Sequence, residues 1–260
     1  MENIWLSLIL STALAALAVW RRALTPAATA TAWCLAVVIT WCGGPVCFAA
    51  LAATFLFTIA AGKLSGKGRE TIEKKLHAKT GKRDAVQILC NVLVAAVMAL
   101  GWALTEWKGF LLACGAALAE SLADSLASEL GVMSKGQPRD ICTGKRVEKG
   151  LSGGVTPLGL GASLLGAVLI AAVCLPLGLG GRGFGLMAAC GFLGALLDSV
   201  MGSRLQAKYR CPVCGTLSER KTHCDVPGTL ERGAAWVNND VVNVLNNAIA
   251  AGLALLLAAL

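Results

Sequence analysis

Carboxylates stand inside otherwise apolar stretches of this chain. Asp124 and Asp198 each lie near the end of such a stretch, and Asp240 lies near the start of another. A charged side chain at the bilayer centre costs about 2.5–3.5 kcal/mol on insertion scales, so acids in these positions indicate a functional site. Carboxylate oxygens are ligands of Mg²⁺, and acids that hold Mg²⁺ against phosphate groups are typical of phosphoryl transfer. We predict that Asp124, Asp198 and Asp240 bind Mg²⁺ and, with Glu129, act in catalysis.

Other polar residues follow helical spacing around these acids. Glu120 and Ser128 stand four residues before and four residues after Asp124, and Asn243 stands three residues after Asp240. Residues at these spacings share one face of a helix. Alanine, glycine and serine crowd the same stretches, which lets helices approach closely and form polar contacts in a membrane. The spacing therefore predicts polar helix faces that meet.

The segment 131–156 offers groups that bind phosphate. It combines basic side chains with the glycine-containing runs Thr143-Gly144 and Ser152-Gly153-Gly154, whose backbone N–H groups can approach an oxyanion closely. A helix predicted directly downstream adds the partial positive charge of its N-terminus. The expected nucleotide-binding or phosphate-binding residues are Lys135, Arg139, Thr143, Lys145, Lys149, Ser152, Gly153 and Gly154, together with the amides Asn239 and Asn243.

A third constellation is typical of a metal site. Cys211 and Cys214 form a C-x₂-C pair, and His223 and Cys224 follow nine and ten residues after Cys214. This spacing fits a tetrahedral zinc site with three cysteines and one histidine. We predict a structural Zn²⁺, because protein ligands fill every position. Adjacent residues rarely point to one centre, so the choice between His223 and Cys224 as a ligand stays open.

The elements that position these residues are predicted from hydropathy. The 260 residues are 56% hydrophobic and only 15% charged, with a mean hydropathy of +0.69. This composition predicts an all-α integral membrane protein, one polytopic domain over 1–260 with seven to eight transmembrane helices. Gly43-Gly44-Pro45 predicts a tight turn between the second and third spans. The spans expected are roughly 3–20, 25–42, 45–62, 85–105, 109–130, 157–177, 184–202 and 238–260.

The basic residues predict the orientation. Of the 23 Lys and Arg residues, all but Lys108 and Arg182 fall on one side of the predicted spans. Basic loops remain cytoplasmic, so we expect both termini on the outer face of a bacterial-type cytoplasmic membrane. The charge follows topology, and few aromatics accompany it, which argues against a nucleic-acid partner. The expected cytoplasmic loops are the basic loop 63–84, the Gly/Lys-rich loop 131–156 and the Cys/His loop 203–237.

The predicted spans place the acids at one depth. Asp124 lies six residues and Asp198 four residues before the cytoplasmic end of its span, or about 9 and 6 Å at 1.5 Å per residue. Asp240 lies within the first turn of a span that enters from the same side. We therefore expect the three carboxylates to meet just below the cytoplasmic surface.

Several motifs resemble those of a known family. Over about 85–260, in order, the chain is similar to the integral membrane proteins of domain of unknown function 92, which include transmembrane protein 19 and the chloroplast phytyl-phosphate kinase. Near the position of Ser125, relatives usually carry Thr or Trp. This departure from the family pattern does not involve the acids. The motifs are Gln87 with Asn91, Ala119–Gly131, Thr143–Lys145, Gly150–Thr156, Leu197–Gly202 with Gln206, the Cys211, Cys214 and Cys224 knuckle, and Asn239–Asn243.

The resemblance implies transfer of a phosphoryl group from a nucleoside triphosphate, CTP being favoured, to an isoprenoid monophosphate. The product is the isoprenoid diphosphate, and the enzyme is a Mg²⁺-dependent phosphotransferase. Neither histidine is expected to act as a general base, because His77 lies in the basic loop and His223 in the predicted zinc site. This agrees with a phosphate as the acceptor. An alcohol acceptor usually needs a general base, whereas a phosphate is already ionised. Asp124 or Asp198 could still serve as base for an alcohol.

Three alternatives use the same residues. A transporter or flippase for an anionic lipid or an ion would also need intramembrane acids. A lipid-phosphate cytidylyltransferase would need the same metal and phosphate ligands. The acids would also be explained by structural pairing with Lys or Arg across helices.

Overall fold

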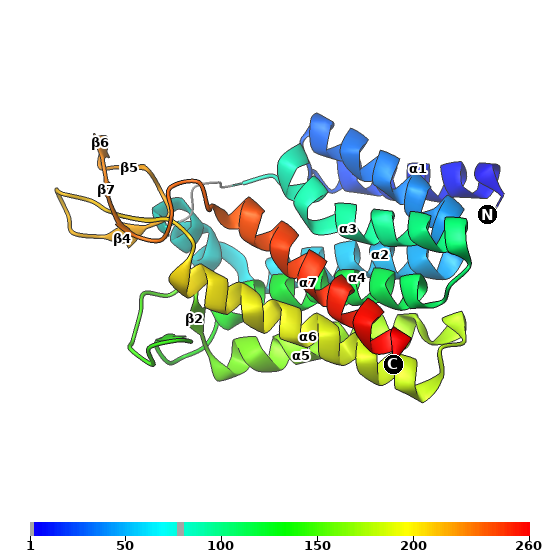
Figure 1. The fold of residues 1–260 in the computed structure, drawn as a ribbon. Coiled ribbons are helices and arrows are strands. Elements are labelled where there is room, and N and C mark those ends of the chain that lie inside the picture. The colour runs from blue at the N-terminus through cyan, green and yellow to red at the C-terminus, as the bar shows by residue number, and fades with distance from the viewer. Residues whose placement is uncertain (1–2, 77–80) are drawn as a thin grey trace.

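The computed structural model describes residues 3–76 and 81–260, and within α2 it leaves out the side chains of residues 67–71 and 73–75 (Figure 1). The described chain is a bundle of helices with small strand pairs at one end. We call this the ribbon end. The helices are α1 (Ile4–Trp20), α2 (Pro26–Leu76), α3 (Ala85–Thr105), α4 (Gly109–Gly131), α5 (Pro157–Val173), the 3₁₀ turn η1 (Leu175–Leu177), α6 (Gly180–Arg204) and α7 (Asn239–Ala259).

Helix α4 is the centre of the bundle. It packs against α2, α3, α5, α6 and α7, and most of its side chains are buried. Small residues permit this packing: a Cβ added at Gly166 of α5 would lie 3.0 Å from the Ala123 backbone, and one at Gly191 of α6 would lie 2.6 Å from Ala119 Cβ. A polar residue on α4 is therefore held between several neighbouring helices.

Helix α2 is interrupted at Gly44, where φ is 82° and ψ is 179°. The Thr25 N–H donates to the Arg83 carbonyl at 3.1 Å, which places the start of α2 beside the start of α3. Ser65 contacts Glu129 in the last turn of α4, at the same end of the bundle. Because both ends of this stretch lie together, the chain must reverse between them. The break lies where the sequence predicts a turn, at a backbone angle that glycine adopts freely.

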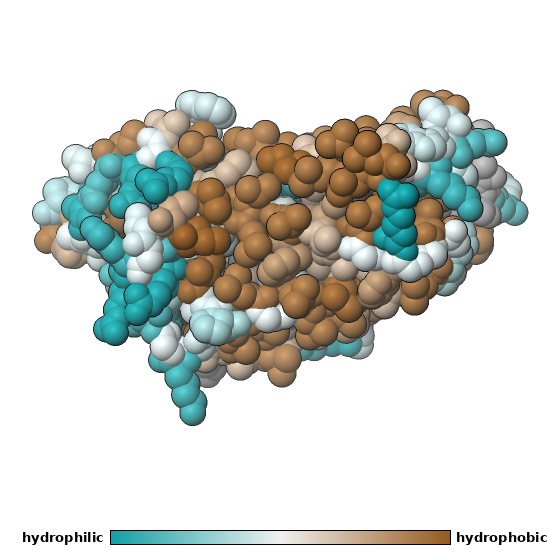
Figure 2. Space-filling view, turned by 60° about the horizontal axis from the view of Figure 1, so that its bottom comes forward, coloured by the Kyte–Doolittle hydropathy of each residue, from teal (hydrophilic) through white to brown (hydrophobic). Residues whose placement is uncertain are grey.

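In the described part of the chain, five helical segments are long and apolar enough to cross a membrane: Pro26–Gly66, Ala85–Thr105, Gly109–Gly131, Gly180–Arg204 and Asn239–Ala259. The apolar helices Ile4–Trp20 and Pro157–Val173 are shorter. In Figure 2 hydrophobic residues form a belt across the middle of the molecule, between hydrophilic residues at its two ends. A belt of this kind is suited to lipid contact, and the chain is an integral membrane protein.

Among the described residues, α3, α5 and α7 begin at the ribbon end with a side-chain cap, as does α2, where Thr25 Oγ1 accepts from Ala28 N at 3.2 Å. Asp84 and Gln87 form a capping box on α3, Thr156 accepts from Gly159 at the start of α5, and Asn238 accepts from Val241 at the start of α7. These caps satisfy N–H groups that have no partner within the helix. They also fix where the first turns of α3, α5 and α7 begin.

The predicted loops contain more regular structure than an all-α prediction allows. Residues 63–76, expected as part of a basic loop, continue α2 beyond a second break at Gly66, and His77 lies outside the described residues. The segment 131–156 contains the pair β1 (Arg139–Asp140) and β2 (Gly154–Val155). Strands of two residues are too short to show an alternating pattern in sequence, which is why they were not predicted.

The segment after α6 folds as a set of short strands that we call the Cys/His ribbon, residues 206–234. One sheet has the order β4-β3-β7, and β5 pairs with β6 in a separate hairpin. Both are antiparallel. The strands are β3 (Lys208–Arg210), β4 (Leu217–Ser218), β5 (Thr222–His223), β6 (Val226–Pro227) and β7 (Thr229–Arg232).

Candidate functional site

A cavity of about 960 Å³ opens at the ribbon end of the bundle, and α4 contributes a large part of its wall. Helices α2, α3, α5, α6 and α7 and the Cys/His ribbon complete it. The carboxylates that line it are Asp124 and Glu129 from α4, Asp198 from α6, Asp240 from α7 and Glu219 from the ribbon. The structure thus places all four acids with a predicted catalytic role on the wall of one cavity.

Amides of α7 orient the Asp198 carboxylate. Asn246 Nδ2 donates to Asp198 Oδ2 at 2.6 Å. Asn243, with its amide nitrogen turned toward the acid, donates to the same oxygen at 3.3 Å and to the Asn239 carbonyl at 3.2 Å. Both amides engage Oδ2, so among these contacts Oδ1 is the oxygen left for a ligand in the cavity.

Behind the cavity wall lies a second acid with an amide partner. Glu120 is 1% exposed and does not line the cavity, and its Oε2 accepts from Asn247 Nδ2 at 2.6 Å. Ser121 Oγ lies 2.7 Å from the Asn91 carbonyl and 3.3 Å from Asn247 Oδ1. This network joins α3, α4 and α7 and holds the polar face of α4 in register with α7.

The carboxylates are close enough to repel one another. Glu120 interacts electrostatically with both Asp124 and Asp198, and the latter two interact with each other. A bound cation relieves such repulsion. The ligand oxygens of Asp124, Asp198 and Asp240 are not gathered within 4.8 Å of one another, so they form no closed protein cage. Mg²⁺ usually takes one or two carboxylates and completes its shell with waters and substrate phosphates, which the cavity has room for.

Glu129 is held on the α2 side of the cavity. Ser65 Oγ donates to its Oε2 at 2.9 Å, and a Cβ added at Gly62 would lie 3.5 Å from the same oxygen. This contact ties α2 to the end of α4. The Glu129 carboxylate therefore has a positioning partner as well as access to the cavity.

The stretch from Gly150 to Thr156, which we call the glycine loop, lines the cavity beside the acids. Gly153 has a φ of 85°, and a Cβ there would lie 2.6 Å from Ser203 Cα. Position 153 therefore requires glycine, both because the loop packs closely on α6 and because the backbone has a positive φ there. Lys208 Nζ donates to the Ser152 carbonyl at 2.6 Å, and burial lowers the pKa of this ammonium group. The Ser152 hydroxyl bonds Glu219.

Thr143 lies outside the cavity and belongs to a group of hydrogen bonds around Asp140, which we call the Asp140 cluster. The buried Asp140 carboxylate accepts from Thr143 N at 2.8 Å, Thr143 Oγ1 at 3.0 Å, Cys142 N at 3.1 Å and Ser203 Oγ at 2.8 Å. Arg232 Nη1 lies 3.6 Å from Oδ2. Burial alone would raise the pKa of Asp140, but the hydrogen bonds from Ser203, Thr143 and Cys142 outweigh it and lower the pKa. The Asp140 cluster connects the 131–156 segment to α6 through Ser203 and to the ribbon through Arg232.

Four cations expected to bind phosphate lie elsewhere: Lys135, Arg139, Lys145 and Lys149 are not among the described residues that line the cavity. Arg139 Nη1 donates to the Gly144 carbonyl at 2.9 Å, and Lys149 Nζ donates to the Ser134 carbonyl at 2.5 Å. Both side chains therefore brace their own loop. Of the other expected phosphate ligands, Ser152, Gly153, Gly154, Asn239 and Asn243 do line the cavity.

Other cations line the cavity in their place: Lys63, Arg83, Arg220 and Lys221. Lys63 comes from α2, Arg83 lies two residues before α3, and Arg220 and Lys221 belong to the ribbon. They could not be predicted from the sequence, because they come from separate segments without a common motif. Only the tertiary fold brings these segments to the cavity. Gln206 also lines the cavity, is 1% exposed and has no hydrogen-bond partner among the described residues for either amide atom. The sequence singled it out only as part of a motif.

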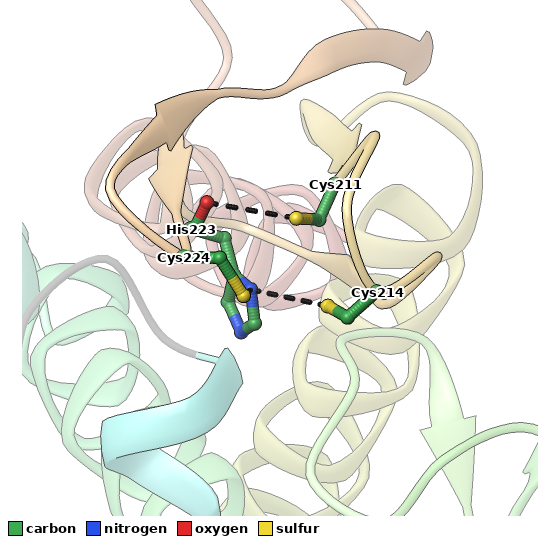
Figure 3. Close-up of side chains that lie close together, drawn as sticks. All are labelled: Cys211, Cys214, His223 and Cys224. Atoms are coloured by element: carbon green, nitrogen blue, oxygen red, sulfur yellow. Dashed lines mark hydrogen bonds between the residues drawn. The ribbon is translucent and has the colours of Figure 1, made fainter.

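The Cys/His cluster (Cys211, Cys214, His223 and Cys224) gathers four ligand atoms within 4.8 Å of one another (Figure 3). His223 Nδ1 lies 3.4 Å from Cys214 Sγ and 3.2 Å from Cys224 Sγ. A tetrahedral Zn²⁺ with ordinary bond lengths separates such N and S ligands by about 3.6 Å. The donor set and spacing therefore fit zinc.

The backbone explains how adjacent residues reach one centre. Cys224 and Asp225 have φ values of 52° and 59° and connect β5 to β6 as a two-residue turn. Positive φ at both positions is the signature of the type I′ hairpin turn. The turn swings the Cys224 side chain to the side on which His223 lies (Figure 3). Hydrogen bonding with Thr216 lowers the pKa of Cys214 to about 6, whereas hydrogen bonding with Cys214 raises the pKa of Cys224 to about 11, so the thiolate that a metal requires is favoured at Cys214 and disfavoured at Cys224.

The fold and site define a polytopic helical membrane protein with an acid-lined cavity at one end of its bundle. The chain belongs to the DUF92 family of integral membrane proteins, whose model matches residues 9–251. It is 31% identical over 196 residues to Protein PGR of Arabidopsis thaliana, covering 61% of this chain and 65% of that protein.

Two prokaryotic relatives are uncharacterised membrane proteins. The one from Synechocystis is 29% identical over 262 aligned residues, covering 96% of this chain and 90% of the relative. The one from Methanocaldococcus jannaschii is 35% identical over 104 residues, covering 39% and 43%. The chain thus spans less than two thirds of the plant and archaeal relatives. No solved structure matches it.

Proposed function

We propose that this protein is a membrane-embedded, Mg²⁺-dependent kinase that transfers the γ-phosphoryl group of a nucleoside triphosphate, CTP being favoured, to an isoprenoid monophosphate. The observation that carries the proposal is the convergence of Asp124, Asp198 and Asp240, from three different helices, on one cavity that also contains basic side chains. Acids and cations lining one cavity suit a substrate pair that brings both phosphates and divalent metal.

The proposed orientation places the ribbon end in the cytoplasm. We take the break at Gly44 to divide α2 into two crossings; with the two shorter apolar helices, the proposed topology has eight crossings among the described residues and both termini outside. Exposed tryptophans support two interfaces: Trp20 and Trp236 lie at the ribbon end, and Trp5 and Trp107 at the other. A nucleotide would then reach the cavity from the cytoplasm, and the lipid tail from the bilayer.

In the proposed reaction an oxygen of the lipid monophosphate forms a bond to the γ-phosphorus. The bond from that phosphorus to the β–γ bridging oxygen breaks, and the nucleoside diphosphate leaves with the electron pair. A bound Mg²⁺ would supply charge neutralisation at the phosphates. Asp198, oriented by Asn246 and Asn243, would hold it together with Asp124 or Asp240. Because the acceptor is already ionised, no general base is required.

Features around the cavity favour anions despite its acids. The first turns of α3, α5 and α7 contribute Gln87, Thr156 and Asn239 to the wall, so three helix N-termini lie at its edge. Helix N-termini carry a partial positive charge and favour phosphate. Lys63 and Arg83 line the same cavity. We also propose that the Cys/His cluster binds one structural Zn²⁺.

The test is turnover by the purified protein. Prenyl alcohols and prenyl monophosphates of several lengths are offered with CTP, ATP, GTP or UTP and Mg²⁺, and lipid products are separated and identified by mass. The proposal expects a diphosphate from a monophosphate and none from an alcohol, with activity lost when Mg²⁺ is chelated. Phosphorylation of alcohols alone would contradict the acceptor, and a protein without any lipid product would contradict the kinase.

A further inference from the structure

The Cys/His ribbon contributes a short segment of its own to the cavity. Glu219, Arg220, Lys221 and Thr222 all line the cavity wall. They stand between two members of the Cys/His cluster, Cys214 on one side and His223 on the other. We call residues 219–222 the arm.

The backbone of the arm is anchored where it faces the bundle and the hairpin. The Glu219 N–H donates to the Leu76 carbonyl at the end of α2 at 2.9 Å. The Lys221 carbonyl accepts from Gly228 N at 2.9 Å, which fixes it against the segment after β6. The arm therefore leaves β4 at one side and enters β5, whose last residue is His223, at the other.

The β5–β6 hairpin, which ends the arm, has little backbone pairing of its own apart from the cluster. The strands of the ribbon have two to four residues, and the turn after His223 holds two non-glycine residues, Cys224 and Asp225, at positive φ. Positive φ is unfavourable for Cys224, although Asp225 tolerates it as part of the type I′ turn. Small domains of this kind usually depend on a bound metal for folding. A metal on the cluster would therefore fix the end of the arm at His223 and, through Cys214, the segment that leads into β4.

Two of the four arm residues are cations of the kind that bind a polyphosphate. Arg220 is half-buried and Lys221 is exposed, and both line the cavity, whereas no lysine or arginine of the 131–156 segment lines it among the described residues. An Arg fork and a Lys point charge are the side chains that commonly hold phosphate oxygens. The cytoplasmic position proposed for the ribbon suits the nucleotide rather than the lipid.

We propose that Arg220 and Lys221 bind the phosphates of the nucleoside triphosphate, and that Zn²⁺ on Cys211, Cys214, His223 and Cys224 holds them over the cavity. Metal occupancy of the ribbon then controls nucleotide affinity while the helical bundle and the lipid site stay intact. This inference rests on the proposed kinase function for the identity of the ligand. It adds the subsite and its dependence on the metal.

The experiment measures binding rather than turnover. Full-length protein in detergent is titrated with CTP and Mg²⁺ by calorimetry, and separately with farnesyl monophosphate, while zinc is quantified by elemental analysis. Lys221→Ala should raise the Kd for CTP about tenfold or more, with zinc content and the Kd for farnesyl monophosphate unchanged. Arg146→Ala is the matched control, because Arg146 is an exposed cation that does not line the cavity.

Cys214→Ser should lose zinc and raise the CTP Kd at least as much as Lys221→Ala. Chelation of the wild type, reversed by added Zn²⁺, gives the same comparison if that variant fails to fold. Wild-type CTP affinity in Lys221→Ala, or in a zinc-free protein, would overturn the inference alone. Weakened farnesyl monophosphate binding with intact CTP binding would also overturn it. A wild type that binds no nucleoside triphosphate would overturn the proposed function as well.

Discussion

Asn246 of α7 donates a hydrogen bond of 2.6 Å to Oδ2 of Asp198 on α6, although the two residues are 48 positions apart in sequence. The Asn246 side chain is fully buried, so the bond is shielded from water. Through it the last helix of the chain sets the orientation of an acid that faces the cavity. In metal sites, partners of this kind fix the ligand oxygen and are typically worth tenfold to a hundredfold in metal affinity.

Asn246→Ala should therefore raise the Mg²⁺ concentration needed for half-maximal activity by tenfold to a hundredfold. The KM for the lipid should change little, because Asn246 does not line the cavity. The measurement is a Mg²⁺ titration of turnover, with Asn246→Asp as a second variant that keeps size but cannot donate when ionised. An unchanged Mg²⁺ dependence in both variants would show that this amide does not orient a metal ligand.

Asp124→Asn and Asp198→Asn should each abolish turnover while the protein still folds and inserts. Each substitution also removes an acid whose ionisation is opposed by its acidic neighbours. In the absence of Mg²⁺ the variants should therefore melt at the same temperature as the wild type or higher. Thermal unfolding in detergent, with and without Mg²⁺, checks both points. Retained activity in both variants would exclude this cavity as the active site.

Gly153 and Gly144 form a matched pair for testing the glycine loop. Both have positive φ, but a Cβ at Gly153 would meet Ser203 Cα at 2.6 Å, whereas one at Gly144 meets nothing within 4 Å. Gly144→Ala should cost about 1 kcal/mol of stability for its backbone conformation. Gly153→Ala should cost about 1–3 kcal/mol more from overpacking. Equal losses in chemical unfolding would mean that the loop does not pack on α6 as described.

The Asp140 cluster should make the free energy of unfolding depend on pH. Because its folded pKa lies below the unfolded value, the carboxylate contributes stability that is fully present above about pH 4 and is lost as the pH falls through the folded pKa. Asp140→Asn should destabilise the protein at pH 7 by about 1–3 kcal/mol. The difference from wild type should shrink in acid. A difference that stays constant between pH 7 and pH 3 would contradict the assignment.

Zinc should be found at about one ion per chain. Cys211→Ser and Cys224→Ser should each lose it, because every ligand position in such a closed site is supplied by protein. Substitution of Cys34, an exposed cysteine far from the ribbon in sequence, is the control and should retain the metal. Zinc retained in the Cys224→Ser variant would mean that Cys224 is not a zinc ligand and that the turn at Cys224 and Asp225 does not serve to bring it to the metal.

The helices could be predicted from sequence because hydropathy and length determine them. The spans expected at 85–105, 109–130 and 238–260 agree with α3, α4 and α7 to within a residue or so. The sixth span was predicted to run to 177, but α5 ends at Val173 and a 3₁₀ turn containing Pro176 follows. Proline cannot continue the hydrogen-bonding pattern of an α-helix.

The acids of the site could also be predicted, because their cost in an apolar helix makes them conspicuous and helix rise gives their depth. The cations could not. Lys63, Arg83 and Lys221 are ordinary basic residues in sequence, and only the folding of α2 and the ribbon over the end of α4 brings them to the cavity. The same folding leaves Lys145 outside it.

The most direct test of the central claim follows a label from nucleotide to lipid. Purified protein, Mg²⁺ and a prenyl monophosphate are incubated with CTP labelled at either the γ-phosphate or the α-phosphate, with Asp124→Asn as the blank. The account predicts label in the lipid diphosphate from γ-labelled CTP only, and none with the variant. Label from the α-phosphate would mean cytidylyl transfer, and no labelled lipid from either would contradict catalysis and favour transport.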